Sequence, residues 1–344
     1  MNYDEIMKKI TSGLTGQTEH DVEYLYEQGE QYKTHKLSKE ILRGIGRLIY
    51  EVLPPDKRNR VSNVINNDNL GVEAALDEAE FQINKKNYVR ATEILESIIN
   101  KMESDDGERL MYKEDSVSEY HCFRNPFEQA LYCELFKPQK AVRRIPQAFD
   151  HVYYMYGTLL FEVQKYDEAK SALIKAVKLN PINTDALFEL SEIYKLDRDW
   201  DDYIDSTKHC LKVAYTGEGL SRCYRNLGFY YIEMEDYDLA AALYYFSMRF
   251  GHKSTMAQSQ LFYIQQKTGE QAPLPSLDSL EDIFAENDIQ FGPDNIVVSL
   301  ATSIGKQAEE NRTYSIARYL YTILYDITLN DEIIEWLENL PQDE

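Results

Sequence analysis

The stretch DHVYYMYGTLLFEVQKYDEAKSALIKAVKLNP, residues 150–181, decides the fold. Apolar residues recur along it at helical spacing, for example at Val152 and Leu159 in its first half. A short polar turn, residues 165–167, separates two such runs. Pro181 ends the second run because proline cannot continue a helix. The stretch therefore predicts a hairpin of two helices.

The same spacing recurs five times along the chain. A small residue is followed twelve positions later by a second residue, and an aromatic side chain stands three places before that second residue. The five sets are Ala79/Ala91 with Tyr88, Gly157/Ala169 with Tyr166, Ser191/Tyr203 with Trp200, Gly228/Ala240 with Tyr237, and Gly305/Ala317 with Tyr314. Fixed spacing of this kind indicates a repeat protein, in which small residues let the two helices of a hairpin cross closely. Tyr203, in place of an alanine, argues against a tight crossing in its own unit.

Residues 150–181 resemble a tetratricopeptide repeat, whose pattern runs W-x2-L-G-x2-Y, then A-x3-F, an alanine and a closing proline. The positions that carry the resemblance are Tyr153, Tyr156, Gly157, Leu160, Ala169, Leu173, Ala176 and Pro181. Gly157 and Ser191 are 34 residues apart, which is the period of that family, whereas Ser191 and Gly228 are 37 apart. The resemblance implies an all-α fold, a right-handed superhelical solenoid of helical hairpins. It also implies a surface that holds a protein or peptide.

We expect six segments. They are an N-terminal helical capping region at 1–70 (with helices near 3–12, 18–33 and 38–52 and a short one in KRNRVSNVINN), a first hairpin at 71–102, an insertion at 103–149, three repeat units at 150–253, a divergent helical hairpin at 254–297 that continues the stack, and a final unit with a capping helix at 298–344. Within the insertion, RLMYKEDSVSEYHCF is compatible with a short β-hairpin around residues 114–116. NPFEQALYCELF predicts a helix with Asn125 as its N-cap and Pro126 at its first position.

Charge argues against bulk nucleic-acid binding for the whole molecule. The chain has 59 acidic and 37 basic residues and a net charge of −22, and phosphate contacts need a basic field. The start, MNYDEIMKKITSG, lacks the apolar core of a signal peptide, and no run approaches 18 apolar residues. We therefore expect a cytoplasmic protein that does not enter a membrane.

No motif in the chain predicts catalysis or a cofactor. The one G-x-G, at Gly44 and Gly46, falls inside an expected helix, not after a strand, so it does not indicate a phosphate loop. His121, Cys122 and Cys133 share the insertion, but their spacing fits no zinc pattern and no fourth ligand is evident. We expect no enzyme activity, no cofactor and no metal.

The resemblance places a partner on the first helices of the hairpins, because these line the concave side of a tetratricopeptide stack. The positions that should face inward include Tyr154, Phe161, Phe188, Glu192, Arg222, Arg225, Asn226 and Phe229. Phe161, Phe188 and Phe229 are the expected anchors for an extended or helical peptide; the alternative is that they pack between neighbouring hairpins. Arg222, Arg225 and Asn226 also suggest the carboxylate clamp of some family members, although the preceding unit supplies acidic Asp185 and Glu192.

A second candidate surface is basic. Lys36, Lys39, Arg43 and Arg47 are spaced three, four and four residues apart and share one side of the helix expected at 38–52. Four interpretations of this stripe stay open: it docks an acidic partner, docks on the protein's own acidic body, binds nucleic acid, or is an ordinary solvated face. With it, two functions stay open: a non-enzymatic scaffold or adaptor that binds a protein or peptide, and a peptide-responsive bacterial regulator whose N-terminal region is the effector.

Overall fold

The computed structural model describes residues 3–54, 71–104, 112–251 and 254–341. The chain forms two compact units, Met1–Ser104 and Asp105–Glu344, and each has its own hydrophobic core. The short helix expected in KRNRVSNVINN lies outside the described residues. The other boundaries between the expected segments stay predictions.

The first unit is entirely helical in its described part. Its helices are α1 (Tyr3–Ser12), α2 (Thr18–Tyr32), α3 (Ser38–Val52), α5 (Gly71–Asn84) and α6 (Tyr88–Glu103). The first three pack through buried Ile6, Leu25 and Ile41, and α5 pairs with α6 as a hairpin. These elements confirm the helices expected near 3–12, 18–33 and 38–52.

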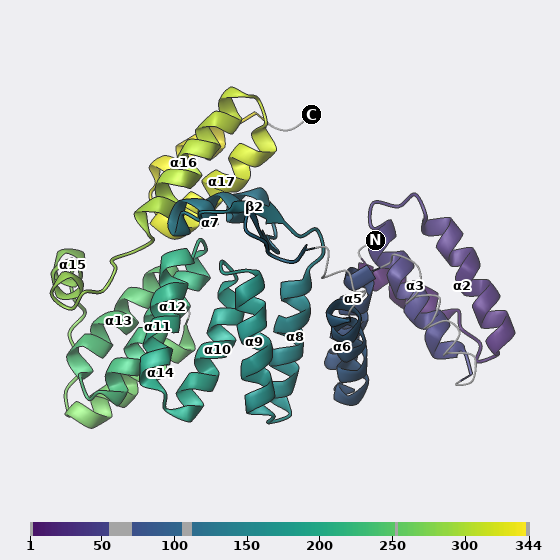
Figure 1. Cartoon of the computed structure of the whole chain (residues 1–344), viewed down its shortest axis with the longest axis horizontal. Coiled ribbons are helices and arrows are strands. Elements are labelled where there is room, and N and C mark those ends of the chain that lie inside the picture. Colours follow the sequence, from purple (N-terminus) through teal and green to yellow (C-terminus); the bar gives the residue numbers. More distant parts are fainter. Residues whose placement is uncertain (1–2, 55–70, 105–111, 252–253, 342–344) are drawn as a thin grey trace. The chain divides into compact units, whose positions relative to one another are not determined.

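The second unit is built on a row of helical hairpins. They are α8 (Phe149–Glu162) with α9 (Tyr166–Leu179), α10 (Thr184–Asp197) with α11 (Trp200–Val213), and α12 (Gly217–Glu233) with α13 (Tyr237–Phe250). Figure 1 shows these six helices side by side. A further hairpin, α16 (Asn295–Glu310) with α17 (Tyr314–Thr328), follows near the end of the chain. The all-α solenoid of hairpins is confirmed.

The spacing that recurs five times in the sequence has a direct structural basis. Each of the five aromatic residues is the first residue of the second helix of a hairpin. Two positions before it, the chain takes up a left-handed backbone conformation that closes the turn, at Lys86, Gln164, Arg198, Glu235 and Arg312. A Cβ atom on Gly157 would lie 2.7 Å from Cγ of Leu173, so the helices of that hairpin cross as closely as expected.

The hairpin of α10 and α11 differs from this pattern in one position. Ser191 donates from its hydroxyl to Oγ of Ser206 at 3.1 Å, so the two helices remain close despite Tyr203. The Tyr203 ring is 1% exposed, and its hydroxyl donates to the carbonyl oxygen of Asn226 in the next repeat at 3.0 Å. The large side chain therefore stabilises the contact between neighbouring repeats.

The insertion forms a small parallel β-α-β element, so the expected β-hairpin is wrong. β1 (Ser118–His121) pairs in parallel with β2 (Ala141–Arg144), and α7 (Pro126–Phe136) connects them. Parallel strands need a crossover connection, which α7 supplies, whereas a hairpin joins antiparallel neighbours. The N-cap is confirmed: Oδ1 of Asn125 accepts a hydrogen bond from the Glu128 amide at 3.0 Å.

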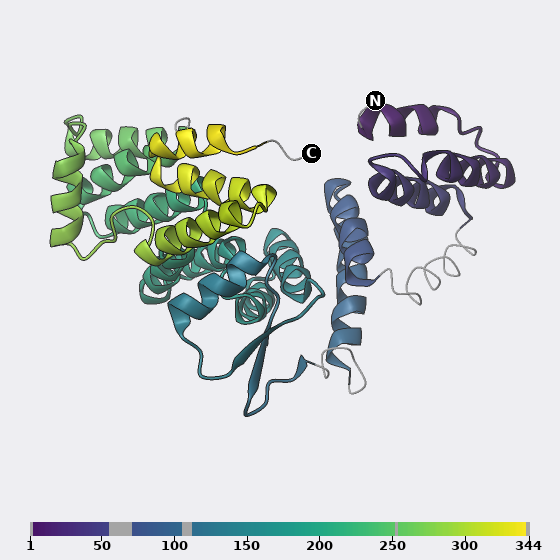
Figure 2. The same cartoon turned by 90° about the horizontal axis from the view of Figure 1, so that it is seen from above.

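The C-terminal helices complete the second unit. α14 (Thr255–Thr268) packs along α13, α15 (Leu277–Glu286) also contacts α13, and α18 (Glu332–Asn339) packs on α17. The hairpin of α16 and α17 is held chiefly by α7 and α12, and Figure 2 shows it lying over the row of stacked helices. The insertion, the repeats and this hairpin share one core. No helix in the described part of the chain is both long and apolar enough to cross a membrane.

Candidate functional site

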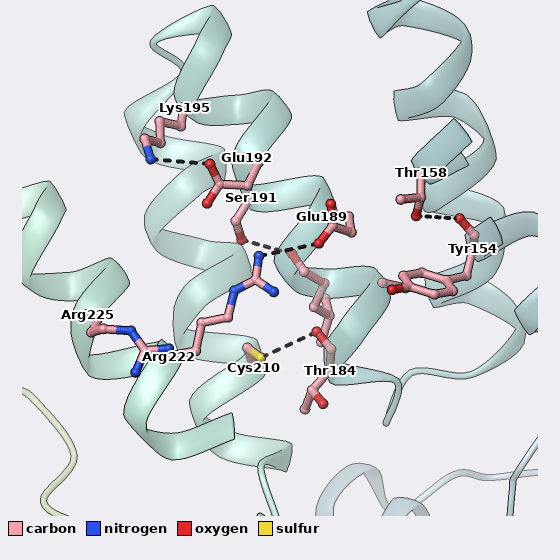
Figure 3. A network of polar contacts seen from close by, with 12 residues as sticks. Tyr154, Thr158, Thr184, Glu189, Ser191, Glu192, Lys195, Cys210, Arg222 and Arg225 are labelled. Carbon is pink, nitrogen blue, oxygen red and sulfur yellow. Dashed lines mark hydrogen bonds and ion pairs between the residues drawn. The ribbon is translucent and has the colours of Figure 1, made fainter. Parts of the chain in front are cut away.

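The candidate site is the surface formed by the first helices α8, α10 and α12, which we call the first-helix face. Figure 3 shows its polar side chains: Tyr154 and Thr158 from α8, Glu189, Glu192 and Lys195 from α10, and Arg222 and Arg225 from α12. Neighbouring repeats are in register here because each hairpin repeats the spacing of the last. Equivalent positions of successive first helices therefore lie in a row.

Arg222 links two repeats at the centre of this face. Its guanidinium group reaches from α12 to Oε1 of Glu189 in α10 at 3.4 Å, and the two side chains are 32% and 20% exposed. Burial raises the pKa of Glu189, and the positive charge of Arg222 opposes that shift. The pair is thus partly desolvated, a setting in which a charged partner interacts more strongly than at a fully wet surface.

A second charge pair lies one turn further along α10. Glu192 and Lys195 are 3.2 Å apart and about one-third exposed. The Lys195 ammonium group also lies 4.2 Å from the centroid of the Phe229 ring in α12. Phe229 is half-buried and packs near Trp200 and Tyr203. A partly exposed aromatic ring therefore lies beside a charge pair.

Tyr154 provides the aromatic surface on α8. Its ring is half-buried and stacks on His151, with 5.5 Å between the ring centroids. Burial, followed by the carboxylates of Asp185 and Glu189, raises the pKa of the Tyr154 phenol. The phenol therefore stays protonated at neutral pH and can donate a hydrogen bond to a bound molecule.

Of the three expected anchors, Phe188 is buried, whereas Phe161 and Phe229 are half-buried. Phe188 is 4% exposed, belongs to the main core and is covered by the guanidinium group of Arg222. Phe161 packs edge-on against Tyr166 of its own hairpin at 5.4 Å. A partner would meet Phe229 and Tyr154 first, and Phe188 only after Arg222 had moved.

The residues suggested for a carboxylate clamp already have partners in the chain. Arg225 donates to Glu218 at 2.8 Å and to the hydroxyl of Ser221, and Arg222 is paired with Glu189. The Asn226 side chain is buried, and its amide nitrogen has no hydrogen-bond partner among the residues that the structure describes. A carboxylate would therefore have to displace Glu218 or Glu189 before either arginine could bind it.

Sequence reasoning omitted Glu189, which forms the central ion pair. Asp185, Glu189 and Glu192 are spaced four and three residues apart, so they share one side of α10. That spacing was sufficient to find Glu189.

The basic stripe is described only in part. Lys36 is exposed, whereas the side chains of Lys39, Arg43 and Arg47 lie outside what the structure describes. The stripe stays a prediction.

The histidine of the insertion packs among aromatic rings. His121 lies beside Phe123 and Tyr132, and its Nε2 atom is 3.4 Å from Oε1 of Glu119. The Tyr132 hydroxyl donates to the same oxygen at 2.8 Å. Within the described ranges, no group of three or more His, Cys, Asp or Glu side chains could hold a metal ion.

Comparison with known proteins identifies the repeat. The tetratricopeptide repeat family profile matches residues 150–183, which cover the α8–α9 hairpin. The chain therefore contains a tetratricopeptide repeat. No curated protein sequence matches it.

Solved structures with a similar course of the chain include other tetratricopeptide repeat proteins. A tetratricopeptide repeat protein from Parabacteroides merdae is 11% identical, with 92% of this chain and 97% of that one covered and a TM-score of 0.45. MamA is 16% identical, with 70% and 96% covered and a TM-score of 0.36. The hetero-tetramer Cut9–Hcn1 gives 11% identity, 93% and 60% coverage and a TM-score of 0.33.

Proposed function

We propose that the chain is a non-enzymatic scaffold that binds a protein or peptide segment on its first-helix face. The repeat belongs to a family whose members serve in protein–protein interaction, and that supports the general class. The observation that carries the proposal is the row of partly buried charge pairs and aromatic edges on α8, α10 and α12. Ordered side chains that are half-exposed lose little conformational entropy when a partner covers them.

The chemistry of this face favours a segment that carries both charges and apolar side chains. Glu189 with Arg222 and Glu192 with Lys195 offer both signs, while Tyr154 and Phe229 offer aromatic contact. An acidic side chain of the partner replaces Glu189 as the ion-pair partner of Arg222. A basic side chain of the partner replaces Lys195 as the ion-pair partner of Glu192. An apolar side chain then lies against Phe229.

The test is a pair of matched double variants, used to capture partners from a native lysate and then to measure affinity for the captured protein. Glu189→Gln/Arg222→Met removes both central charges and keeps an unbranched aliphatic stem at each position. Lys165→Met/Glu168→Gln removes the same charges from an exposed pair on the α8–α9 turn, where the two groups lie 3.5 Å apart.

We expect the first double variant to weaken binding at least about ten-fold, the equivalent of ~1.4 kcal/mol. The control should retain the wild-type affinity. Equal affinity of the two variants for the captured protein would contradict the assignment of the first-helix face.

A further inference from the structure

α14 has the features of a first helix that lacks its second helix. In every complete hairpin, the left-handed turn residue comes seven positions after the small crossing residue, as Gln164 follows Gly157 and Glu235 follows Gly228. Gly269, which closes α14, has φ of +81° and comes seven positions after Phe262. Phe262 thus occupies the position that is small in all the other repeats.

The complete hairpins show what normally covers this position. The Cβ atom that Gly157, Gly228 or Gly305 lacks would lie within 3 Å of a second-helix side chain: Leu173, Tyr244 and Tyr321 respectively. After α14 the chain runs through residues 269–276 without a helix, and the helix that then follows, α15, contacts α13. Phe262 is instead 62% exposed.

The exposed side of α14 carries two large apolar residues around one small residue. Ala257 and Ile264 pack on α13, whereas Met256 and Phe262 are 63% and 62% exposed. These two residues stand three positions either side of Ser259, which is also exposed. A small residue flanked symmetrically by two large apolar ones is complementary to its own copy in antiparallel orientation.

Charge indicates where two copies of the chain can meet. The chain carries a net charge of −22, so two molecules repel each other over most of their surfaces. Of the helices that the structure describes, α14 alone has neither Asp nor Glu, and it carries one basic residue, Lys267. Two copies therefore meet along α14 without bringing acidic side chains of these helices together.

We propose that the exposed side of α14 is a homodimer interface, with two α14 helices packed antiparallel about a two-fold axis at Ser259. Met256 of each copy then packs against Phe262 of the other, and Ser259 lets the backbones approach. A helix of 14 residues is ~21 Å long, which is short for an interface of the standard size of ~1,600 Å². The dimer is therefore weak and reversible.

Sedimentation velocity of the full chain over a wide range of concentrations tests the dimer. Wild-type protein should shift from monomer to dimer as its concentration rises. Phe262→Glu should weaken this association at least about ten-fold, because it places two carboxylates in the apolar contact. Leu196→Glu is the matched control, since Leu196 is 54% exposed near the end of α10. The control should associate as wild type does.

Cysteine cross-linking tests the position of the axis. In Ser259→Cys the two introduced thiols lie beside the axis and within reach of a disulfide. Gln266 lies on the same exposed side of α14. In Gln266→Cys the thiols of the two copies are therefore separated along the helix axis by the rise of about 14 residues, or ~21 Å. Mild oxidation should give a covalent dimer rapidly with the first variant and slowly with the second.

The proposal is overturned if the wild-type chain stays monomeric at every concentration. This holds even if α14 binds a helix of another protein. Equal cross-linking of the two cysteine variants, or a dimer unaffected by Phe262→Glu, overturns it as well. Far-UV circular dichroism of each variant separates these results from loss of folding.

Discussion

The guanidinium carbon of Arg222 lies 4.4 Å from the centroid of the Phe188 ring and covers it from the side of the first-helix face. The ring belongs to the main core and the arginine to the surface. The same contact therefore contributes to the packing of α10 against α12 and lies at the surface on which we place the partner.

Phe188→Ala should lower the free energy of unfolding by about 3–5 kcal/mol, since it empties a site in a packed core. Arg222→Met should cost much less, because it removes no side chain from the core and the lost cation–π contact is worth ~1 kcal/mol. Urea unfolding followed by circular dichroism measures both. If the two substitutions had similar small effects, Phe188 would be a surface residue and the assignment of roles would be wrong.

The close crossing in the α8–α9 hairpin makes a second prediction. Gly157→Ala should destabilise the second unit by roughly 1–3 kcal/mol, because the new methyl group overlaps Leu173. In a Leu173→Ala background the same change should cost far less, since the overlapping atoms are gone. A double-mutant cycle by urea unfolding gives the coupling. Strictly additive effects would show that Gly157 is not limited by Leu173.

Asp150 predicts a specific pH dependence. Burial raises its pKa to about 6, although Asn180 and Asn183 each donate to its Oδ2 atom at 3.2 Å. In the unfolded chain the carboxyl has the ordinary aspartate pKa of 3.8, so between pH 4 and pH 6 the folded protein binds more protons than the unfolded one. The contribution of Asp150 to the free energy of unfolding therefore falls as pH rises through this range, by at most about 1.4 kcal/mol per unit.

Asp150→Asn removes this titration. The difference in unfolding free energy between wild type and variant should change from pH 4 to pH 6 and stay constant above pH 7. Urea titrations at several pH values measure it. A difference that is the same at every pH would show that the buried carboxyl does not titrate in this range.

The four cysteines should react with thiol reagents in a fixed order. Cys122, Cys210 and Cys223 are buried, whereas Cys133 is half-buried. Burial raises the pKa of both Cys133 and Cys210, and the thiolate is the reactive form. Mass spectrometry after timed alkylation should show slow labelling of Cys133 alone in the folded protein. Labelling of Cys210 at the same rate would indicate that the α11–α12 contact opens readily.

Local pattern was sufficient to predict the helices of the described residues. The five aromatic positions begin second helices, and Asn125 caps α7, because both features depend on neighbours within a few residues. The parallel pairing of Ser118–His121 with Ala141–Arg144 was missed, since AVRR has no alternating apolar pattern and its partner lies on the far side of a helix.

The candidate site was predictable in position and less so in detail. Period and register placed Tyr154, Glu192 and Arg222 on the first-helix face. They did not show that Arg222 covers Phe188, because contact between side chains of two repeats depends on how closely those repeats pack. The attachment of α16 to α7 also escaped the sequence, since it joins segments far apart in the chain.

The most direct test of the first-helix face is hydrogen–deuterium exchange of the chain with and without a captured partner. The account predicts slower exchange in peptides that cover α8, α10 and α12, with the strongest effect around Glu189 and Arg222. Protection confined to the insertion or to α14, with these three helices unchanged, would contradict it.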